Sequence, residues 1–524
     1  MNKFRLLNHK WGMSLLASAL LALSFPPFNL SVLQIPAIFL LLRLTVHSDG
    51  NREAIFYLYP SFILWNLFST YWLMMATVAG GVAAILANAL ILVLPFLIIR
   101  KLFQRDINPL LSSLIAASVW VSYEFLHHNW DLAWPWLTLG NAWSNHIAII
   151  QFITYTGVLG ISFWVFATSA MLWHLVQRRS ASLLICSATF FLVFPGFSLY
   201  SYLSLGDLKT GEAVDVVIVQ PNSDSYQPNG GFSSNQELIT HLLQLSGAAL
   251  TDSSDVLIWP ENALDTSVQT GSPQLSLIRD SLKVWNTPLI TGSGYIDFYN
   301  DEHAPHVVRE TRDGRTYNVF NAALALSPNK EMSIYKKGRL VPIVERFPFV
   351  GFFQSIDIFG WVDWGSISGY GKGGEPTLFE VDSSQTPALI CYDSVFPGWV
   401  NQFVDEGAGF LTIITNDGWW GDSHGHIQHF AYARLRAIEH RMWIARSANN
   451  GISGIISPDG GIQLETVYWT ESAFSYRVYT NSNKTFYGRN GEWFGYTMLL
   501  LALIGLTLIF IKKKPENQVS FSDF

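Results

Sequence analysis

The chain has 524 residues, of which 50% are hydrophobic, 15% aromatic and only 14% charged, and its net charge is −7. Soluble chains average about 25% charged residues, so part of this chain is expected to lie in lipid. No basic patch suggests nucleic acid as a partner. The only two cysteines, Cys186 and Cys391, exclude a disulfide scaffold and a cysteine-rich zinc or iron–sulfur site.

Residues 1–202 form a series of apolar stretches, and each is close to the roughly 20 residues that cross a bilayer as a helix. One further stretch lies near the end of the sequence. A cleavable signal peptide is the alternative for the first stretch, but no small-residue cleavage site follows it. We predict eight transmembrane helices, over residues 11–25, 30–46, 54–76, 79–99, 109–126, 147–176, 181–201 and 492–511.

Positive residues alternate along this series. They cluster before the first stretch and after the second, fourth, sixth and last, whereas the intervening turns carry no lysine or arginine. The clusters are Lys3/Arg5/Lys10, Arg43/Arg52, Arg100/Lys101/Arg105, Arg178/Arg179 and Lys512–Lys514. By the positive-inside rule, both termini are predicted to be cytoplasmic. The predicted domains are a membrane domain (1–202), an external domain (203–490) and a last helix with a cytoplasmic tail (491–524).

The loop Trp130–Trp136 falls on the predicted outer side. Its tryptophans have two interpretations. They form an aromatic belt at the membrane interface, or they form one wall of a groove through which lipid reaches the external domain. The sequence leaves both open.

From Val214 the pattern changes to short β-rich runs that alternate with helical stretches, which is typical of a layered α/β domain. We predict helices over 236–247, 273–285 and 426–445. Strands are predicted over 214–219, 256–259, 288–294, 319–326, 332–335, 388–391, 410–415, 452–457 and 475–479.

Three of these strands end in residues that carry chemistry: Glu261, Lys337 and Cys391. A thiol that attacks an acyl carbon needs a base for its proton and a positive group for the developing oxyanion. Each residue alone has an ordinary structural interpretation, and a free cysteine often packs like a small hydrophobe. An unpaired thiol is nevertheless a liability in an oxidising compartment, so the three together favour catalysis.

The segments around these residues resemble the nitrilase superfamily, whose Glu–Lys–Cys triad lies at strand ends of an α-β-β-α sandwich. The matching motifs are W-P-E-N at Trp259–Asn262, Y-x-K-x-x-L-V-P at Tyr335–Pro342 and I-C-Y-D at Ile390–Asp393. Within that superfamily the whole chain is similar to apolipoprotein N-acyltransferases, membrane enzymes that complete bacterial lipoprotein maturation. The most specific match is N-D-G-W-W-G-D-S at Asn416–Ser423.

The resemblance implies Glu261 as general base, Lys337 as the oxyanion-stabilising cation and Cys391 as nucleophile. The neighbouring Lys336 is expected to be replaceable. Glu345 is implied as a second functional glutamate that holds Lys337 or gates the site, and the backbone N–H of Tyr392 as an oxyanion donor. The other implied supporting or substrate-binding residues are Asp393, Asn416, Trp419 and His429.

The chain departs from the family pattern at three places. Asp393 stands where the family commonly has glutamate, and Ile343-Val344 replace a Phe-Gly pair. The loop after Asn222 lacks a tryptophan that some members use for substrate, so Tyr226 is the candidate substitute. The triad itself is intact.

The implied reaction is N-acylation of the α-amino group of S-diacylglyceryl-cysteine at a lipoprotein N-terminus. It is a ping-pong reaction through a Cys391 thioester, with phosphatidylethanolamine as the expected donor. The resemblance also implies that the protein lies in the bacterial inner membrane, that its catalytic domain is periplasmic and that it acts as a monomer. The apolar segment Phe347–Phe353 is a candidate lid, or it is buried against the membrane domain.

No cofactor or metal is predicted. Histidines at the spacing of His424, His426 and His429 can chelate a metal, but a zinc site needs further ligands that the sequence does not secure. Two other functions remain as alternatives: a membrane-anchored amidase acting on small molecules, and a transporter or receptor with an external binding domain. A transporter is expected to place paired ionisable residues in its helices, but the predicted spans are nearly free of them, with Glu124 as the main exception.

Overall fold

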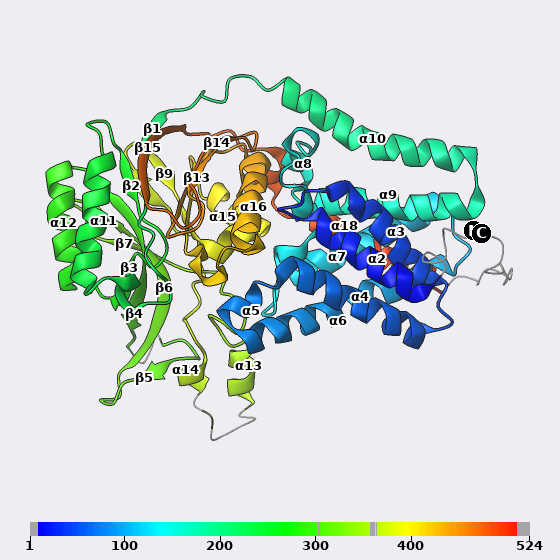
Figure 1. Ribbon diagram of the computed structural model, residues 1–524, viewed down its shortest axis with the longest axis horizontal. Coiled ribbons are helices and arrows are strands. Elements are labelled where there is room, and N and C mark those ends of the chain that lie inside the picture. Colours follow the sequence, from blue (N-terminus) through cyan, green and yellow to red (C-terminus); the bar gives the residue numbers. More distant parts are fainter. Residues whose placement is uncertain (1–8, 301–303, 357–361, 363, 511–524) are drawn as a thin grey trace.

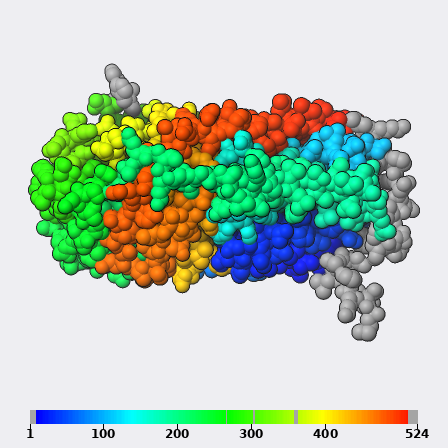
Figure 2. Space-filling model, turned by 90° about the horizontal axis from the view of Figure 1, so that it is seen from above, coloured from blue at the N-terminus to red at the C-terminus, as the bar shows by residue number. Residues whose placement is uncertain are grey.

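The computed structural model describes residues 9–300, 304–356, 362 and 364–510. The chain forms a helical region and a sheet region that lie end to end along its longest axis (Figure 1). Seen from above, the same elongated shape has α10 on the visible surface of the helical end (Figure 2).

In the part of the chain that the structure describes, the helical region contains eight long helices. They are α2 (Lys10–Ser24), α3 (Gln34–Val46), α4 (Asn51–Thr70), α6 (Val78–Phe103), α7 (Pro109–His127), α9 (Leu159–Arg178), α10 (Ala181–Leu203) and α18 (Trp493–Leu508). Four of the described helices, namely α6, α7, α9 and α10, are long and apolar enough to cross a membrane. Helices α2, α3 and α18 are apolar but shorter. The predicted number of eight spans therefore exceeds what length and composition support.

Two predicted spans are interrupted. The stretch 54–76 is helical to Thr70 and continues only as the short α5 (Leu73–Ala76). The stretch 147–176 is divided into the 3-10 helix η4 (Ile147–Ile149), α8 (Ile153–Thr156) and α9. The break after α8 is at Gly157, whose φ of 65° favours glycine, and a Cβ there would lie 2.6 Å from the Tyr487 ring. The basic residues at 3, 5 and 512–514 and the predicted cytoplasmic tail (511–524) lie outside the described residues.

The sheet region contains two large sheets. The first has the order β15-β1-β2-β4-β6-β5, with β3 on β4 and β7 on β6, and the second has the order β10-β11-β12-β13-β14. The first sheet comprises β1 (Ala213–Gln220), β2 (Val256–Ile258), β3 (Leu264–Val268), β4 (Leu289–Phe298), β5 (Arg309–Glu310), β6 (Thr316–Leu326), β7 (Ser333–Lys336) and β15 (Ser472–Tyr479). The second comprises β10 (Ala388–Ile390), β11 (Leu411–Thr415), β12 (Ile444–Ala448), β13 (Gly454–Ile456) and β14 (Ile462–Glu465). A separate hairpin joins β8 (Phe379–Val381) and β9 (Ser384–Thr386).

The two sheets pack face to face between helices. Along β1, Val216 and Ile218 share one core with residues of the second sheet, whereas Val217 and Val219 pack with α11 (Asn235–Ala249) and α12 (Pro273–Trp285). This alternation follows from the two-residue period of a strand. Helices α15 (Pro397–Asp405) and α16 (His424–His440) lie on the other side of the second sheet (Figure 1). The predicted α-β-β-α sandwich is therefore confirmed.

The nine predicted strands are all present, with shifted ends. The prediction of a helix over 426–445 was wrong at its C-terminal end. Helix α16 ends at His440 because Arg441 adopts a left-handed backbone with φ of 54°, and Ile444–Ala448 then forms β12 parallel to β11. The strands that sequence patterns missed are β3, β5, β8, β9, β12 and β14.

Helix α16 joins the two regions through Gln428. Its Oε1 accepts hydrogen bonds from the indoles of Trp72 (3.3 Å) and Trp136 (2.7 Å), and its Nε2 donates to the carbonyls of Pro26 (3.0 Å) and Ser69 (3.1 Å). The side chain is fully buried. One residue of the sheet region thus satisfies polar groups from three segments of the helical region.

Candidate active site

Cys391 lies directly after β10, at the carboxyl end of the strand. It begins the 3-10 helix η7 (Cys391–Val395) and has φ of 46°, a left-handed conformation that is uncommon for a residue with a side chain. Its carbonyl oxygen accepts hydrogen bonds from Ser394 Oγ at 2.7 Å and from His429 Nε2 at 3.2 Å. The thiol is free and the residue is buried, whereas Cys186 is exposed.

Glu261 follows β2, and both of its carboxylate oxygens are engaged. Oε1 accepts from Asn321 Nδ2 at 2.8 Å and lies 3.3 Å from Lys337 Nζ, and Oε2 accepts the backbone N–H of Asn416 at 2.9 Å. Gly292 of β4 is packed against this segment, since a Cβ there would lie 2.5 Å from the Glu261 Cα. The carboxylate is therefore held from three elements.

Lys337 follows β7 and is 1% exposed. Its Nζ donates to Glu345 Oε1 at 2.9 Å and reaches Glu261 Oε1, so one ammonium bridges two carboxylates. The second oxygen of Glu345 accepts the backbone N–H of Val341 at 2.8 Å. Lys336, in contrast, forms an ion pair with Asp297 and lies over the Phe320 ring. Of the two adjacent lysines, the structure brings Lys337 to the site.

Asn321 was not singled out by the sequence. It lies in β6, and its Nδ2 donates to both Glu261 (2.8 Å) and Glu345 (2.9 Å). The sequence does contain a signal for Asn321, because it is a polar residue in an apolar strand and buried polar groups usually have a hydrogen-bond partner.

The charges of this group perturb one another. Burial raises the pKa of Glu261, although the charge of Lys337 opposes the rise. Burial alone would lower the pKa of Lys337, but the charges of Glu261 and Glu345 outweigh it and hold that pKa well above its usual value. Burial, and then the charge of Glu261, raise the pKa of the Cys391 thiol. The resting thiol is therefore neutral and needs a base before it can attack.

Tyr392 and Asp393 hold the turn that carries the thiol. The Tyr392 hydroxyl donates to the Ala133 carbonyl at 3.0 Å. Asp393 accepts hydrogen bonds from the backbone N–H groups of Arg339 (2.8 Å) and Ile390 (3.1 Å) and from the Tyr335 hydroxyl (2.9 Å). Burial raises the pKa of Asp393 to about 6 against the opposing charge of Lys337. The short side chain of Asp393 thus accepts hydrogen bonds from all three donors at this position.

Asn416 and Trp419 come from the loop after β11. Asn416 caps the 3-10 helix η8 (Asp417–Trp420), and its Oδ1 accepts from Ser225 Oγ at 2.7 Å. Trp419 is 38% exposed and lines the cavity described below. Its backbone carbonyl accepts the Tyr226 hydroxyl at 2.8 Å. Tyr226 therefore contacts a residue of the cavity wall.

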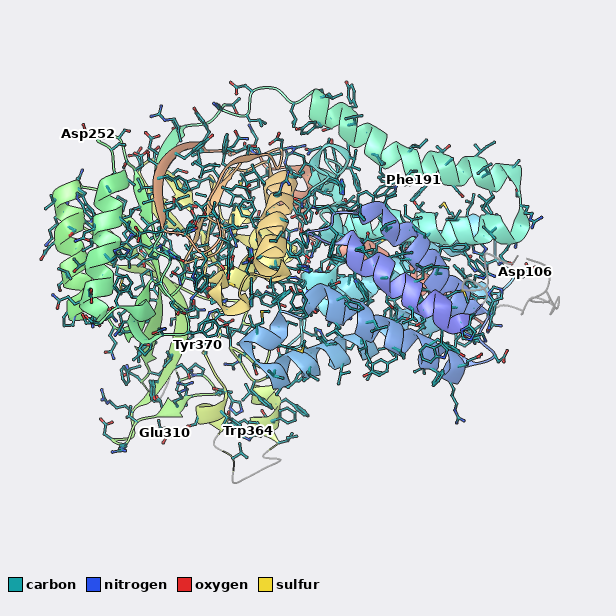
Figure 3. All side chains as sticks on the ribbon, in the orientation of Figure 1. Asp106, Phe191, Asp252, Glu310, Trp364 and Tyr370 are labelled. Atoms are coloured by element: carbon teal, nitrogen blue, oxygen red, sulfur yellow. The ribbon has the colours of Figure 1, made fainter. Side chains whose placement is uncertain are left out.

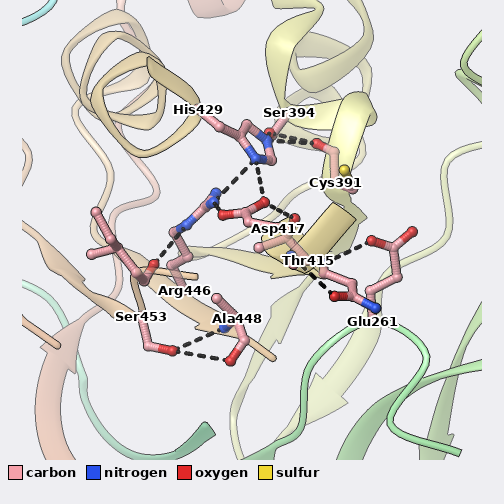
Figure 4. A network of polar contacts seen from close by, with 12 residues as sticks. Glu261, Cys391, Ser394, Thr415, Asp417, His429, Arg446, Ala448 and Ser453 are labelled. Carbon is pink, nitrogen blue, oxygen red and sulfur yellow. Dashed lines mark hydrogen bonds and ion pairs between the residues drawn. The ribbon is translucent and has the colours of Figure 1, made fainter. Parts of the chain in front are cut away.

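His429 extends from α16 toward Ser394 and the backbone carbonyl of Cys391 (Figure 4). Its Nδ1 lies 2.9 Å from Asp417 Oδ1, and Arg446 Nη2 donates to Asp417 Oδ2 at 2.7 Å. Burial raises the pKa of Asp417, but the charge of Arg446, with help from His429, outweighs burial and holds that pKa well below its usual range. The sequence pattern assigned Arg446 no role; this residue lies in β12, and its ion pair with Asp417 joins that strand to the loop after β11.

Three groups here could in principle hold a metal ion, since ligand atoms of Cys391, Asp417 and His429 lie within 4.8 Å of one another. Both oxygens of Asp417 and both nitrogens of His429 already have protein partners. The other two histidines that the sequence suggested as metal ligands lie apart from these three groups. His424 packs on Phe28 and Tyr71, and His426 stacks on Tyr468. The three histidines therefore do not converge.

A cavity of about 430 Å³ contains the thiol, Glu261, Lys337 and Glu345. Five tryptophans, Trp72, Trp134, Trp136, Trp419 and Trp420, form part of its wall. It continues along α6 from Gly80 to Ile91, which is about 16 Å at 1.5 Å per residue. Of the two interpretations of the loop Trp130–Trp136, the structure supports the cavity wall, because Leu132, Ala133, Trp134 and Trp136 all line it.

The segment Phe347–Phe353 is neither wholly buried nor free. Val350 is buried, whereas Phe352 is 62% exposed. The backbone N–H of Phe349 donates to Asp131 Oδ2 at 2.9 Å, and its ring meets that of Trp130 edge-on. This segment therefore contacts the same loop that lines the cavity.

The chain matches two family models. The apolipoprotein N-acyltransferase N-terminal domain matches residues 17–171, and carbon-nitrogen hydrolase matches residues 216–478. The sequence is 29% identical over 532 residues to an apolipoprotein N-acyltransferase of Chlorobaculum tepidum, covering 97% of this chain and 98% of the relative. It is 26% identical over 535 residues to that of Geobacter metallireducens, covering 97% and 96%.

Among solved structures, the sheet region is similar to a CN-hydrolase superfamily protein from Xanthomonas campestris. The two share 19% identity with a TM-score of 0.36, and the match covers 51% of this chain and 91% of the other.

Proposed function

The chain belongs to the carbon-nitrogen hydrolase family, and we propose that it transfers an acyl chain from a phospholipid to the α-amino group of S-diacylglyceryl-cysteine at lipoprotein N-termini. The observation that carries this proposal is a neutral buried thiol beside a Glu–Lys pair, inside a cavity that continues along an apolar helix. The two family models, one on each region, favour this function over a membrane-anchored amidase acting on small molecules.

In the first half-reaction, Glu261 accepts the proton of Cys391, and the sulfur attacks an ester carbonyl of the phospholipid. Lys337 Nζ and the backbone N–H of Tyr392 stabilise the negative charge that forms on the carbonyl oxygen. As the carbon–oxygen ester bond breaks, Glu261 returns its proton to the departing alkoxide. A lysophospholipid leaves and a Cys391 thioester remains.

In the second half-reaction, the α-amino group attacks the thioester carbon. Glu261 takes a proton from the amine and delivers it to the departing thiolate of Cys391. The product is an amide, and the thiol is restored. A thioester suits this exchange because the sulfur is a good leaving group for an amine, provided that water is excluded. The tryptophan-lined wall of the cavity supplies that exclusion.

Glu345, Asn321 and the His429–Asp417–Arg446 network act as positioning residues. Glu345 and Asn321 hold the Lys337–Glu261 pair in place. Asp393 and His429 hold the turn around Cys391 through its neighbouring backbone groups. Asn416 fixes Glu261 through its N–H, and Trp419 contributes to the substrate cavity.

We further propose that all eight long helices lie in the bacterial inner membrane, with α3, α4 and α18 packed against the four that are long and apolar enough to cross it, and α2 packed against α3 and α4. The domain limits are then 1–202, 203–490 and 491–524, with the catalytic domain on the periplasmic side and both termini cytoplasmic. The alternation of positive residues supports this orientation. The expected donor is phosphatidylethanolamine, and the enzyme is expected to act as a monomer.

The proposal is tested by incubating the purified full-length protein with phospholipid labelled in its acyl chain. We expect labelled protein that neutral hydroxylamine releases, and none with Cys391→Ala. Added diacylglyceryl peptide should discharge the label as N-acyl peptide. If wild type instead releases ammonia from small amides and never carries label, the amidase alternative is correct.

A further inference from the structure

Three positively charged side chains, Arg339, Arg346 and Lys372, lie beside the residues that line the cavity. We call them the cationic cluster. Arg339 and Arg346 flank the cavity-lining stretch 341–345, and Lys372 lies two residues from Tyr370, which also lines the cavity. Tyr370 is labelled in Figure 3.

Backbone pairing brings these side chains together. The N–H of Tyr370 donates to the Glu345 carbonyl at 2.8 Å, and the N–H of Gly373 donates to the Lys337 carbonyl at 2.9 Å. The segments 337–346 and 369–373 therefore run side by side. Arg346 Nη1 also donates to the Tyr370 carbonyl at 2.6 Å. These two paired segments thus carry both Lys337 and the cationic cluster, which lies at the margin of the cavity.

The cluster carries more charge than its surroundings neutralise. Within the described part of the chain, none of the three side chains forms an ion pair within 4.0 Å of a carboxylate. The acids that face the cluster are Asp131 and Glu492, and Asp131 accepts the N–H of Phe349. Lys372 lies at the surface, and partial burial of its ammonium, followed by the charge of Arg339, lowers its pKa; Arg346 adds to this effect against the opposing charge of Asp131.

The guanidinium of Arg339 stacks on aromatic rings. Its guanidinium lies over the rings of Phe396 (5.3 Å) and Trp399 (5.1 Å), and its Nε is buried without a hydrogen-bond partner. A stacked guanidinium keeps its N–H edge available for an anion. Like charges that gather beside a cavity without ion-pair partners favour an anionic ligand.

We propose that the cationic cluster binds the phosphate of the phospholipid donor and so delivers its ester carbonyl to Cys391. This inference rests on the proposed function. Phosphate oxygens accept charge-assisted hydrogen bonds from arginine and lysine, and the arginine fork matches their geometry. The acyl chain then extends along α6 while the headgroup stays outside the apolar part of the cavity.

The test compares two acyl donors in detergent micelles with the full-length protein. One is phosphatidylethanolamine, and the other is p-nitrophenyl palmitate, which has no phosphate. For Arg339→Gln and for Lys372→Gln we expect KM for the phospholipid to rise about tenfold, because each substitution removes one charge-assisted hydrogen bond to the phosphate. The rate of thioester formation from the nitrophenyl ester should stay within about twofold of wild type.

Lys330→Gln is the matched control, because Lys330 forms an exposed ion pair with Glu380 and is expected to leave both donors unaffected. Arg339→Gln could lose activity by misfolding, because Arg339 also packs on aromatic rings. Lys372→Gln avoids this ambiguity, because the Lys372 side chain lies at the surface. If both donors lose rate equally, or if neither changes, the phosphate assignment is overturned. Failure of wild type to form a thioester with either donor would instead overturn the proposed function.

Inorganic phosphate separates general anion binding from lipid recognition. We expect millimolar phosphate to inhibit the phospholipid reaction of wild type but not that of Arg339→Gln. This result would support a phosphate site. Diacylglycerol, a neutral lipid with the same ester, should be a poor donor for wild type and unchanged by the variants. If diacylglycerol instead equals the phospholipid in wild type, the headgroup phosphate is not recognised and the inference fails.

Discussion

At the scale of single residues, the site depends on charges that are buried together. Among the described residues, Lys337 is the only one whose ammonium bridges Glu261 and Glu345, and all three side chains are buried or nearly so. Burial of this kind is tolerated only when every charge has a partner. The catalytic geometry and the local stability are therefore coupled, and a variant at one position affects both.

Replacing the bridging cation tests this coupling. Lys337→Met leaves two carboxylates facing each other, and we expect a loss of about 3–5 kcal/mol of stability, as for other broken buried ion pairs. Acyl transfer should fall by at least about a hundredfold because the oxyanion loses its cation. Lys336→Met is the matched control. Thermal unfolding and thioester formation measure the two effects, and equal losses in both variants would contradict the assignment.

In the proposed mechanism, the pH dependence of acylation follows from Glu261. The base must be ionised, so activity rises with pH as Glu261 loses its proton, and its raised pKa moves this rise above that of an exposed glutamate. The hydrogen bond from Asn321 lowers the pKa of Glu261. We therefore expect Asn321→Ala to shift the rise in kcat/KM to still higher pH. An unchanged profile would show that Glu261 is not the base.

At the scale of elements, the strand ends are held by close packing of backbones. Gly292 of β4 lies against the segment that begins with Glu261, and any side chain there displaces that segment. Helix α16 has a corresponding role on the other side, since His429 contacts the thiol turn and Gln428 contacts the helical region. Both features join the site to the rest of the chain.

We expect Gly292→Ala to abolish most acyl transfer while the protein stays folded, because its Cβ would lie 2.5 Å from the Glu261 Cα. Gly247→Ala is the control, since only Trp285 lies near its Cβ, at 3.5 Å. Thioester yield and circular dichroism measure activity and fold. Normal activity of Gly292→Ala would mean that the position of Glu261 is not critical.

Gln428→Leu tests the junction between the two regions. The substitution leaves two indole N–H groups and two carbonyls without a partner, and each such group costs about 1–3 kcal/mol. We expect a large drop in the midpoint of thermal unfolding in detergent. Gln463→Leu, which removes only one half-buried contact to Ser457, should change it little. A small effect at Gln428 would contradict its role in joining the regions.

At the scale of the whole molecule, the cavity exists because the two regions meet. Its polar end comes from the sheet region, and its apolar walls come from α5, α6 and the loop 132–136. Neither region alone would supply all the residues that line the cavity around the thiol. This arrangement gives a physical reason for combining a thiol-bearing sandwich with membrane helices.

The length of the cavity predicts selectivity among acyl chains. Ala84 lines the cavity on α6, so Ala84→Trp should fill part of it and reduce the rate with long-chain donors more than with short-chain donors. Leu90→Trp is the control, because Leu90 is 56% exposed and does not line the cavity. A competition assay with mixed chain lengths measures the ratio. The same ratio in both variants would show that the acyl chain lies elsewhere.

The sequence by itself determined the features that local chemistry controls. Apolar stretches, alternating strands and the polar residues that end them predicted the sandwich, the helical region and the group of Glu261, Lys337 and Cys391. These follow from periodicity and backbone preferences within a few residues. The match of ordered motifs then identified the family before any contact was known.

Only the tertiary structure decided which distant groups meet. Asn321 bridging two carboxylates, Arg446 paired with Asp417, Gln428 joining the regions and the cationic cluster all depend on contacts between segments far apart in sequence. The end of α16 at Arg441 and the break at Gly157 likewise depend on packing that overrides helical propensity. The physical reason is that burial and hydrogen-bond partners are properties of the folded chain, which a local pattern does not contain.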